Sequence, residues 1–203
     1  MYLTFFVLIP GGRIIMKKLR AVIAAALACV TMFSLSACAN FKVIDDEEVF
    51  YDALDAALSV DEDETYHVKG AKVNGDKTEY VIYAKDGDNF YTYIRFKKED
   101  DAMDYFDEFY DDFDTIRKDK EFTGSSSISA SKTKGTVLFN GDLEGGTELG
   151  FFRHNKNISS DVEIYGGVYV NKNVYIEVCS VNGSKRDKEK AAAFLKELGF
   201  PKP

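Results

Sequence analysis

Few residues in this 203-residue sequence are of the types that carry out acid–base or nucleophilic chemistry. It contains two histidines, His67 and His154, and three cysteines, Cys29, Cys38 and Cys179. A catalytic histidine needs a positioned partner, and neither histidine has a neighbouring pattern that supplies one. Cys179 and His154 would form a thiol nucleophile pair only if the fold brought them together, and nothing in the local sequence indicates this. We therefore expect no catalytic residue, and a hydrolase is kept only as an alternative.

Metal and phosphate chemistry is not indicated either. The acidic clusters at 61–64, 86–89 and 140–146 invite a calcium interpretation, but Thr65 and Phe90 stand where an EF-hand loop needs its third ligand. Neither histidine has the ligand spacing of a zinc site. The stretch "GDLEGG" lacks the Lys-Ser/Thr ending of a phosphate-binding loop. The sequence predicts no metal and no cofactor.

Cys38 belongs to a segment with a different kind of chemistry. A basic stretch at 17–20 precedes an apolar run at 21–35, and two small residues, Ser36 and Ala37, stand immediately before Cys38. A basic start, a short apolar run and small residues at the cleavage point are features of a secretory signal. Residues 16–38 resemble the lipobox signal peptide of bacterial lipoproteins, in which Leu and two small residues precede Cys.

The resemblance implies that residues 1–37 are a signal peptide and that Cys38 becomes the lipidated first residue of the mature chain. Residues 38–43 are then a short tether. Two acyl chains are enough to hold a protein on a membrane. We therefore expect the mature protein to be anchored on the outer face of a bacterial cell membrane. An uncleaved membrane anchor is the alternative, although the apolar run is shorter than the usual span of about 20 residues. Residues 1–15 place a second apolar run before the basic stretch, so our hypothesis is that translation starts at Met16.

Charge and cysteine content restrict the partners and the compartment. Of 26 basic and 34 acidic residues, four basic and no acidic ones lie in 1–38, which leaves 22 against 34, a net charge of −12. Such a charge disfavours nucleic acid as a partner. Cys29 leaves with the signal peptide and Cys38 carries lipid, so Cys179 has no partner for a disulfide. An exported domain without a disulfide fits a Gram-positive envelope better than an oxidising periplasm.

Residues 44–203 predict a single extracytoplasmic domain of the α+β class. Apolar residues recur at helical spacing in 46–59, 99–117 and 184–198, and the last helix begins with a capping box formed by Ser184 and Asp187. Alternating segments separated by turns predict an antiparallel sheet of six or seven strands, with the helices packed on one face in two layers. The Ser-rich segment 122–134 reads as a loop or weak edge strand. The order strand, turn, strand, helix occurs in 78–113 and again in 161–200, which indicates an internal duplication.

Alternation along the predicted strands separates aliphatic from tyrosine-containing faces. If the aliphatic residues meet the helices, the opposite face carries Arg95 and six tyrosines: Tyr83, Tyr91, Tyr93, Tyr165, Tyr169 and Tyr175. Tyrosine combines a large apolar body with a polar tip, so this face is our candidate binding site for a protein, peptide or glycan. The alternative is that cross-strand tyrosine pairs only stabilise the sheet.

The helix at 99–117 carries nine acidic residues around its aromatic stripe. A charged, solvated face is one interpretation, and a docking site for a basic partner is the other.

The features of the whole sequence together predict a lipid-anchored, non-enzymatic binding or interaction protein of the bacterial envelope. The alternative is a structural or accessory envelope protein in a larger complex.

Overall fold

The computed structural model describes residues 41–151, 154–157 and 160–203, and side chains outside 152–159. The predicted signal peptide and Cys38 lie outside these residues. The helices are α2 (Glu47–Leu58), α3 (Glu99–Lys118) and α4 (Lys185–Glu197), with a short 3₁₀ helix, η1, at Glu62–Glu64. Within the described residues, no helix is long and apolar enough to cross a membrane.

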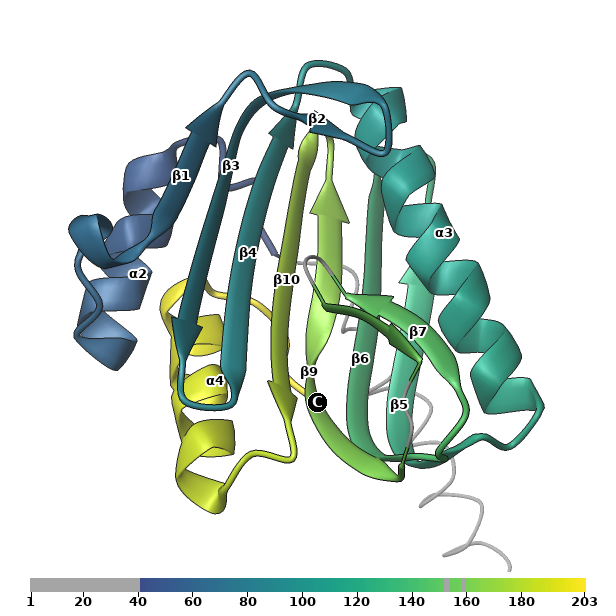
Figure 1. Ribbon diagram of the computed structural model, residues 1–203. Coiled ribbons are helices and arrows are strands. Elements are labelled where there is room, and N and C mark those ends of the chain that lie inside the picture. Colours follow the sequence, from purple (N-terminus) through teal and green to yellow (C-terminus); the bar gives the residue numbers. More distant parts are fainter. Residues whose placement is uncertain (1–40, 152–153, 158–159) are drawn as a thin grey trace, which may run out of the picture. The chain divides into compact units, whose positions relative to one another are not determined.

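An antiparallel sheet forms the centre of the domain (Figure 1). Its strand order is β1-β3-β4-β10-β9-β6-β5, with β2 paired to β3. The bounds are β1 Tyr66–Lys69, β2 Lys72–Val73, β3 Asp76–Asp86, β4 Asn89–Phe96, β5 Phe122–Ala130, β6 Lys134–Leu143, β9 Val162–Asn171 and β10 Val174–Val181. β7 (Glu148–Phe151) and β8 (His154–Asn157) form a separate two-stranded ribbon. The predicted α+β class with an antiparallel sheet is confirmed.

The helices cover both faces of the sheet, which corrects the expectation that they lie on one. On β4, the ring of Phe96 packs against Tyr105 of α3 at 5.6 Å between centroids. Tyr91, which points to the opposite side of the same strand, packs against Phe194 of α4 at 4.8 Å. Figure 1 accordingly shows α3 in front of the sheet and α2 and α4 behind it. Both alternating sets of side chains on the central strands are therefore core.

Helix α3 forms where its aromatic stripe was predicted. Its buried residues recur at intervals of three and four, while the acidic residues remain on the outer side; the buried set is Ala102, Met103, Phe106, Phe109, Phe113 and Ile116. Gly135 of β6 lies directly under Phe106, and a Cβ added there would overlap the Phe106 ring. The glycine thus lets the aromatic ring lie close to the sheet.

The other helices begin where the sequence indicated. The Asp46 side chain caps α2 by accepting from the Glu48 backbone N–H at 3.1 Å. At α4, the Ser184 backbone N–H donates to the Asp187 carboxylate at 2.8 Å, and the predicted capping box is present. The Ser-rich segment pairs with β6 as edge strand β5.

The recurring order of elements is present, as β3-β4-α3 and β9-β10-α4. The second strands of the two units, β4 and β10, pair with each other at the middle of the sheet. The helices that follow these strands lie on opposite faces.

Candidate functional site

The tyrosines expected on one open face are divided between the two faces. Strand register shows this directly. Thr92 and Ile94 are on the α3 side of β4, and they pair with Tyr83 and Tyr175, so these two tyrosines face the same side. Tyr91, Tyr93, Tyr165 and Tyr169 point to the side that α2 and α4 cover. Of the six, Tyr83 is half-buried and the other five are buried. The candidate binding face is therefore corrected: these residues do not form an exposed surface.

Several of these hydroxyl groups instead hold the segments at the two ends of the described chain. Tyr93 donates a hydrogen bond of 2.7 Å to the Ile44 carbonyl oxygen, and Tyr169 donates one of 2.6 Å to the Pro201 carbonyl oxygen. Burial raises the pKa of both phenols, so they stay protonated and act as donors. Arg95 makes an ion pair of 2.8 Å with Glu79 and also donates to the Asp45 carbonyl oxygen.

His67 and Cys179, whose side chains the structure describes, lie on opposite faces of the sheet. His67 is half-buried on β1, with its ring near Tyr51 and Tyr80 at centroid distances of 6.2 and 6.0 Å. Cys179 is completely buried on the side of the sheet that faces α3, where burial and then the nearby Glu177 raise the pKa of its thiol. A protonated thiol is a weak nucleophile. The side chain of His154 lies outside the described residues, so its pairing with Cys179 stays a prediction.

The acidic loops have structural roles in the described part of the chain. Asp61 is the N-cap of η1 and forms a capping box with Glu64. Residues 86–89 include the turn between β3 and β4, where Asp86 makes an ion pair with Lys190. Among the described residues, no group of three or more His, Cys, Asp or Glu side chains could hold a metal ion.

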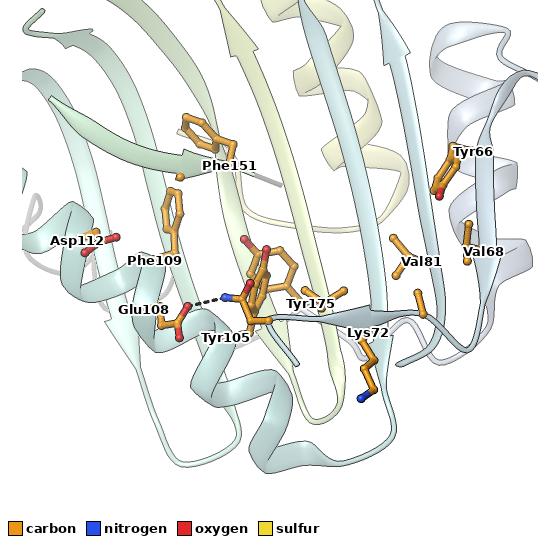
Figure 2. Close-up of a pocket in the computed structure, with 14 residues that line it drawn as sticks. Tyr66, Val68, Lys72, Val81, Tyr105, Glu108, Phe109, Asp112, Phe151 and Tyr175 are labelled. Atoms are coloured by element: carbon orange, nitrogen blue, oxygen red, sulfur yellow. Dashed lines mark hydrogen bonds between the residues drawn. The ribbon is translucent and has the colours of Figure 1, made fainter. Parts of the chain in front are cut away.

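The described residues form a groove on the α3 face of the sheet. Its volume is about 560 Å³, and it lies between α3, the β1–β3 side of the sheet and the end of β7 (Figure 2). Five aromatic and four aliphatic side chains line it: Tyr66, Tyr105, Phe109, Phe151, Tyr175, Val68, Ala71, Val73 and Val81. The polar side chains are Lys72, Asn74, Glu108 and Asp112, and Gly150 completes the lining.

Local geometry positions the groove's side chains. Tyr105, Glu108, Phe109 and Asp112 recur at three- and four-residue intervals on α3, so they share one side of that helix. Across the groove, Asn74 occupies the turn between β2 and β3 with a left-handed φ of 48°. Its side-chain amide donates a hydrogen bond of 2.9 Å to Glu108, which joins this turn to α3 (Figure 2).

Carboxylates dominate the electrostatics beside the groove. Glu177, completely buried on β10, accepts a hydrogen bond of 3.1 Å from the Tyr175 hydroxyl group. Burial, followed by Glu177 and then Glu108, raises the pKa of Tyr105. Burial, followed by Asp111 and Glu148, raises the pKa of Asp112. The groove therefore combines aromatic walls with the carboxylate side chains of Glu108 and Asp112.

Sequence reasoning did not find this groove as a site. Residues 66–81, 105–112 and 150–175 come together only through the fold, and β2, a strand of two residues, was not separated from its neighbours. The available signal was the acidic, aromatic helix at 99–117, for which docking of a basic partner was one interpretation.

Searches with this chain against protein-family models, curated proteins and solved structures found no match.

Proposed function

We propose that this protein is a lipid-anchored, non-enzymatic binding protein on the outer face of a bacterial cell membrane, and that the α3 groove is its ligand site. The size and lining of the groove support its assignment as the ligand site. Its volume of about 560 Å³ is in the usual range of small-molecule sites, which are mostly apolar with a few polar groups. The apolar and aromatic lining, with polar side chains at four positions, has this composition.

The lipobox-like segment and the position of Phe41 support the anchoring part. Phe41 is buried against Tyr169 and Phe200 on the face opposite the groove, and its carbonyl oxygen accepts from Lys134 at 2.8 Å. Phe41 is only three positions after Cys38 in the sequence, a reach of about 11 Å at most. A lipid on Cys38 would thus hold the domain close to the membrane by the face that does not carry the groove.

The absence of an extended apolar patch among the described residues also favours a binding groove over a flat protein interface. The exposed large hydrophobic residues of this part of the chain are Val49 and Tyr66. They belong to different elements, α2 and β1, and Tyr66 itself lines the groove. A stable interface would need a larger contiguous patch.

Anchoring is tested by expressing the gene from Met1 and from Met16 in a Gram-positive host. We expect the membrane fraction to yield an N-terminal peptide that begins at Cys38 and has the added mass of a diacylglyceryl group. Cys38→Ala is the control, and it should lose the lipid and the cleavage. An unmodified Cys38, or equal membrane retention of Cys38→Ala, would overturn the anchor.

The groove is tested by screening a small-molecule library by ligand-observed NMR against the full chain in neutral detergent. Val68 lines the groove and is half-buried, so Val68→Trp should fill part of the space and abolish binding of the compounds found. Val49→Trp makes the same change on the exposed surface of α2 and should leave binding unaltered. If every compound binds Val68→Trp as well as the unaltered chain, the groove is not the ligand site.

A further inference from the structure

Two pairs of contacting aromatic rings form part of the groove's lining. Tyr105 and Tyr175 meet edge to face at 4.8 Å between ring centroids, and Phe109 and Phe151 meet at 5.4 Å. Figure 2 shows these two pairs and, on the far side of the groove, Tyr66. Aromatic ring faces carry negative electrostatic potential and attract cations, most strongly where water is excluded.

The charged groups of the groove have the same preference. Glu108 and Asp112 contribute carboxylates from α3, whereas Lys72 is exposed and extends away from the aromatic side chains (Figure 2). Next to the groove's lining, the buried Glu177 accepts a hydrogen bond from Tyr175. Glu177 and Glu108 both contribute to the raised pKa of Tyr105. An anionic ligand would face the carboxylates of Glu108 and Asp112, and like charges repel.

From these observations we infer that the ligand of the α3 groove is a small organic cation, an ammonium group on an apolar body. This inference rests on the proposed function and specifies the chemistry of its ligand. The ammonium group lies between the rings of Tyr105 and Phe109 and the carboxylates of Glu108 and Asp112. The apolar body packs on Val68, which lines the opposite side of the groove.

The size of the groove favours a small cation over a folded basic protein. About 560 Å³ accommodates a ligand of drug-like dimensions, while a protein partner would need a broad complementary surface. The organic part of the ligand follows from the lining, in which nine of the residues are aromatic or aliphatic. A bare metal ion would leave these apolar walls without a partner.

Three aromatic probes of different charge test the inference: benzyltrimethylammonium, benzyl alcohol and phenylacetate. Each is titrated into the full chain in neutral detergent, and binding is followed by NMR. We expect benzyltrimethylammonium to bind at least about tenfold more tightly than either of the others. The reason is that its contacts with the aromatic rings and with the carboxylates both contribute to the binding free energy. A quaternary ammonium group keeps its charge at every pH, so only the protein titrates.

Charge-neutralising variants locate the contact. The double variant Glu108→Gln with Asp112→Asn should weaken cation binding about tenfold, and the amide oxygen introduced by Glu108→Gln can still accept from Asn74. Its matched control is Asp104→Asn with Asp111→Asn, which removes two charges from exposed positions of the same helix outside the groove lining. This control should change affinity less than about threefold, through screened long-range attraction.

The outcomes separate this inference from the proposed function. If compounds bind in a Val68→Trp-sensitive manner but are neutral or anionic, the groove is a ligand site and the cation inference is wrong. If both charge variants weaken binding equally, the cation interacts with the acidic helix in general and not with the groove. If no compound is sensitive to Val68→Trp, the groove proposal and the cation inference fail together.

Discussion

The side chain of Asn74 donates a hydrogen bond of 2.9 Å to Glu108 and thereby connects the β2–β3 turn with α3 across the candidate groove. Both residues are exposed, and β2 contributes only two residues to the sheet. This hydrogen bond therefore holds a short, weakly paired segment in the position that forms one side of the groove.

Replacing Asn74 with Asp should loosen the β2–β3 turn. The substitution replaces the donor by a second carboxylate beside Glu108, and like charges repel. We expect a stability loss of at most about 1 kcal/mol, because the pair is exposed, and faster hydrogen exchange in residues 70–79. Asn74→Gly is the control for the left-handed φ of 48°: it removes the bond without adding charge and should have the smaller effect. Unchanged exchange in Asn74→Asp would contradict a role for this bond.

Gly135 and Phe106 provide a sharper test of packing under α3. A Cβ at residue 135 would overlap the Phe106 ring, so Gly135→Ala should lower the free energy of unfolding by about 1–3 kcal/mol through overpacking. Denaturant unfolding of the full chain measures this change. Phe106→Leu should also destabilise, but the double variant should lose less than the two single losses added together, since the smaller side chain relieves the overlap. Strict additivity would show that the ring is not what the new methyl group meets.

Local sequence signals predicted the elements of this fold well, for physical reasons that can be named. The capping box at Ser184 and Asp187 and the aromatic stripe of α3 depend on residues within one or two helical turns. Turns such as the one between β3 and β4 are equally local. These features need no knowledge of which distant segment lies opposite.

The assignment of strand faces failed because it depends on distant contacts. Alternation divides each strand into two sets, but does not say which set joins which set on the neighbouring strand. Pairing of Tyr83 with Thr92, and of Tyr175 with Ile94, placed these two tyrosines on the side of the sheet that faces α3. Tyr93 and Tyr169 became core residues because α2, α4 and Phe41 cover the other face. A tyrosine that donates to a backbone carbonyl oxygen is compatible with burial, so composition alone could not distinguish the two cases.

Cys179 should be chemically inert in the folded protein. It is completely buried, and burial together with Glu177 raises the pKa of its thiol, so both access and thiolate formation are suppressed. We expect a polar maleimide to leave Cys179 unlabelled in native protein at pH 8 and to label it quickly in denaturant, as located by peptide mass spectrometry. Val49→Cys, on an exposed position of α2, is the positive control. Native labelling of Cys179 at the rate of the Val49→Cys thiol would show that the α3 face opens readily.

The carboxylate of Asp112 should destabilise the domain at neutral pH. Burial, Asp111 and Glu148 raise the pKa of Asp112 in the folded state, so folding disfavours its ionised form relative to the unfolded chain. Asp112→Asn imitates the protonated group and should increase stability at pH 7 by about 0.2–0.5 kcal/mol, the range of a like-charge contact on a helix.

The pH dependence of this gain gives the sign of the effect. As the pH falls through the raised pKa of Asp112, the carboxylate takes up a proton in the folded state and the penalty disappears. The advantage of Asp112→Asn should therefore shrink below neutral pH and vanish once the pH is below the ordinary aspartate value, whereas Asp114, whose pKa is lowered by Lys118 and Arg117, should lose stabilisation only below that value. Thermal unfolding of the full chain and of Asp112→Asn between pH 3 and 8 measures the difference. An advantage that grows as the pH falls would mean that the Asp112 carboxylate is stabilised in the fold. In that case a cation in the groove would gain less from contacting it.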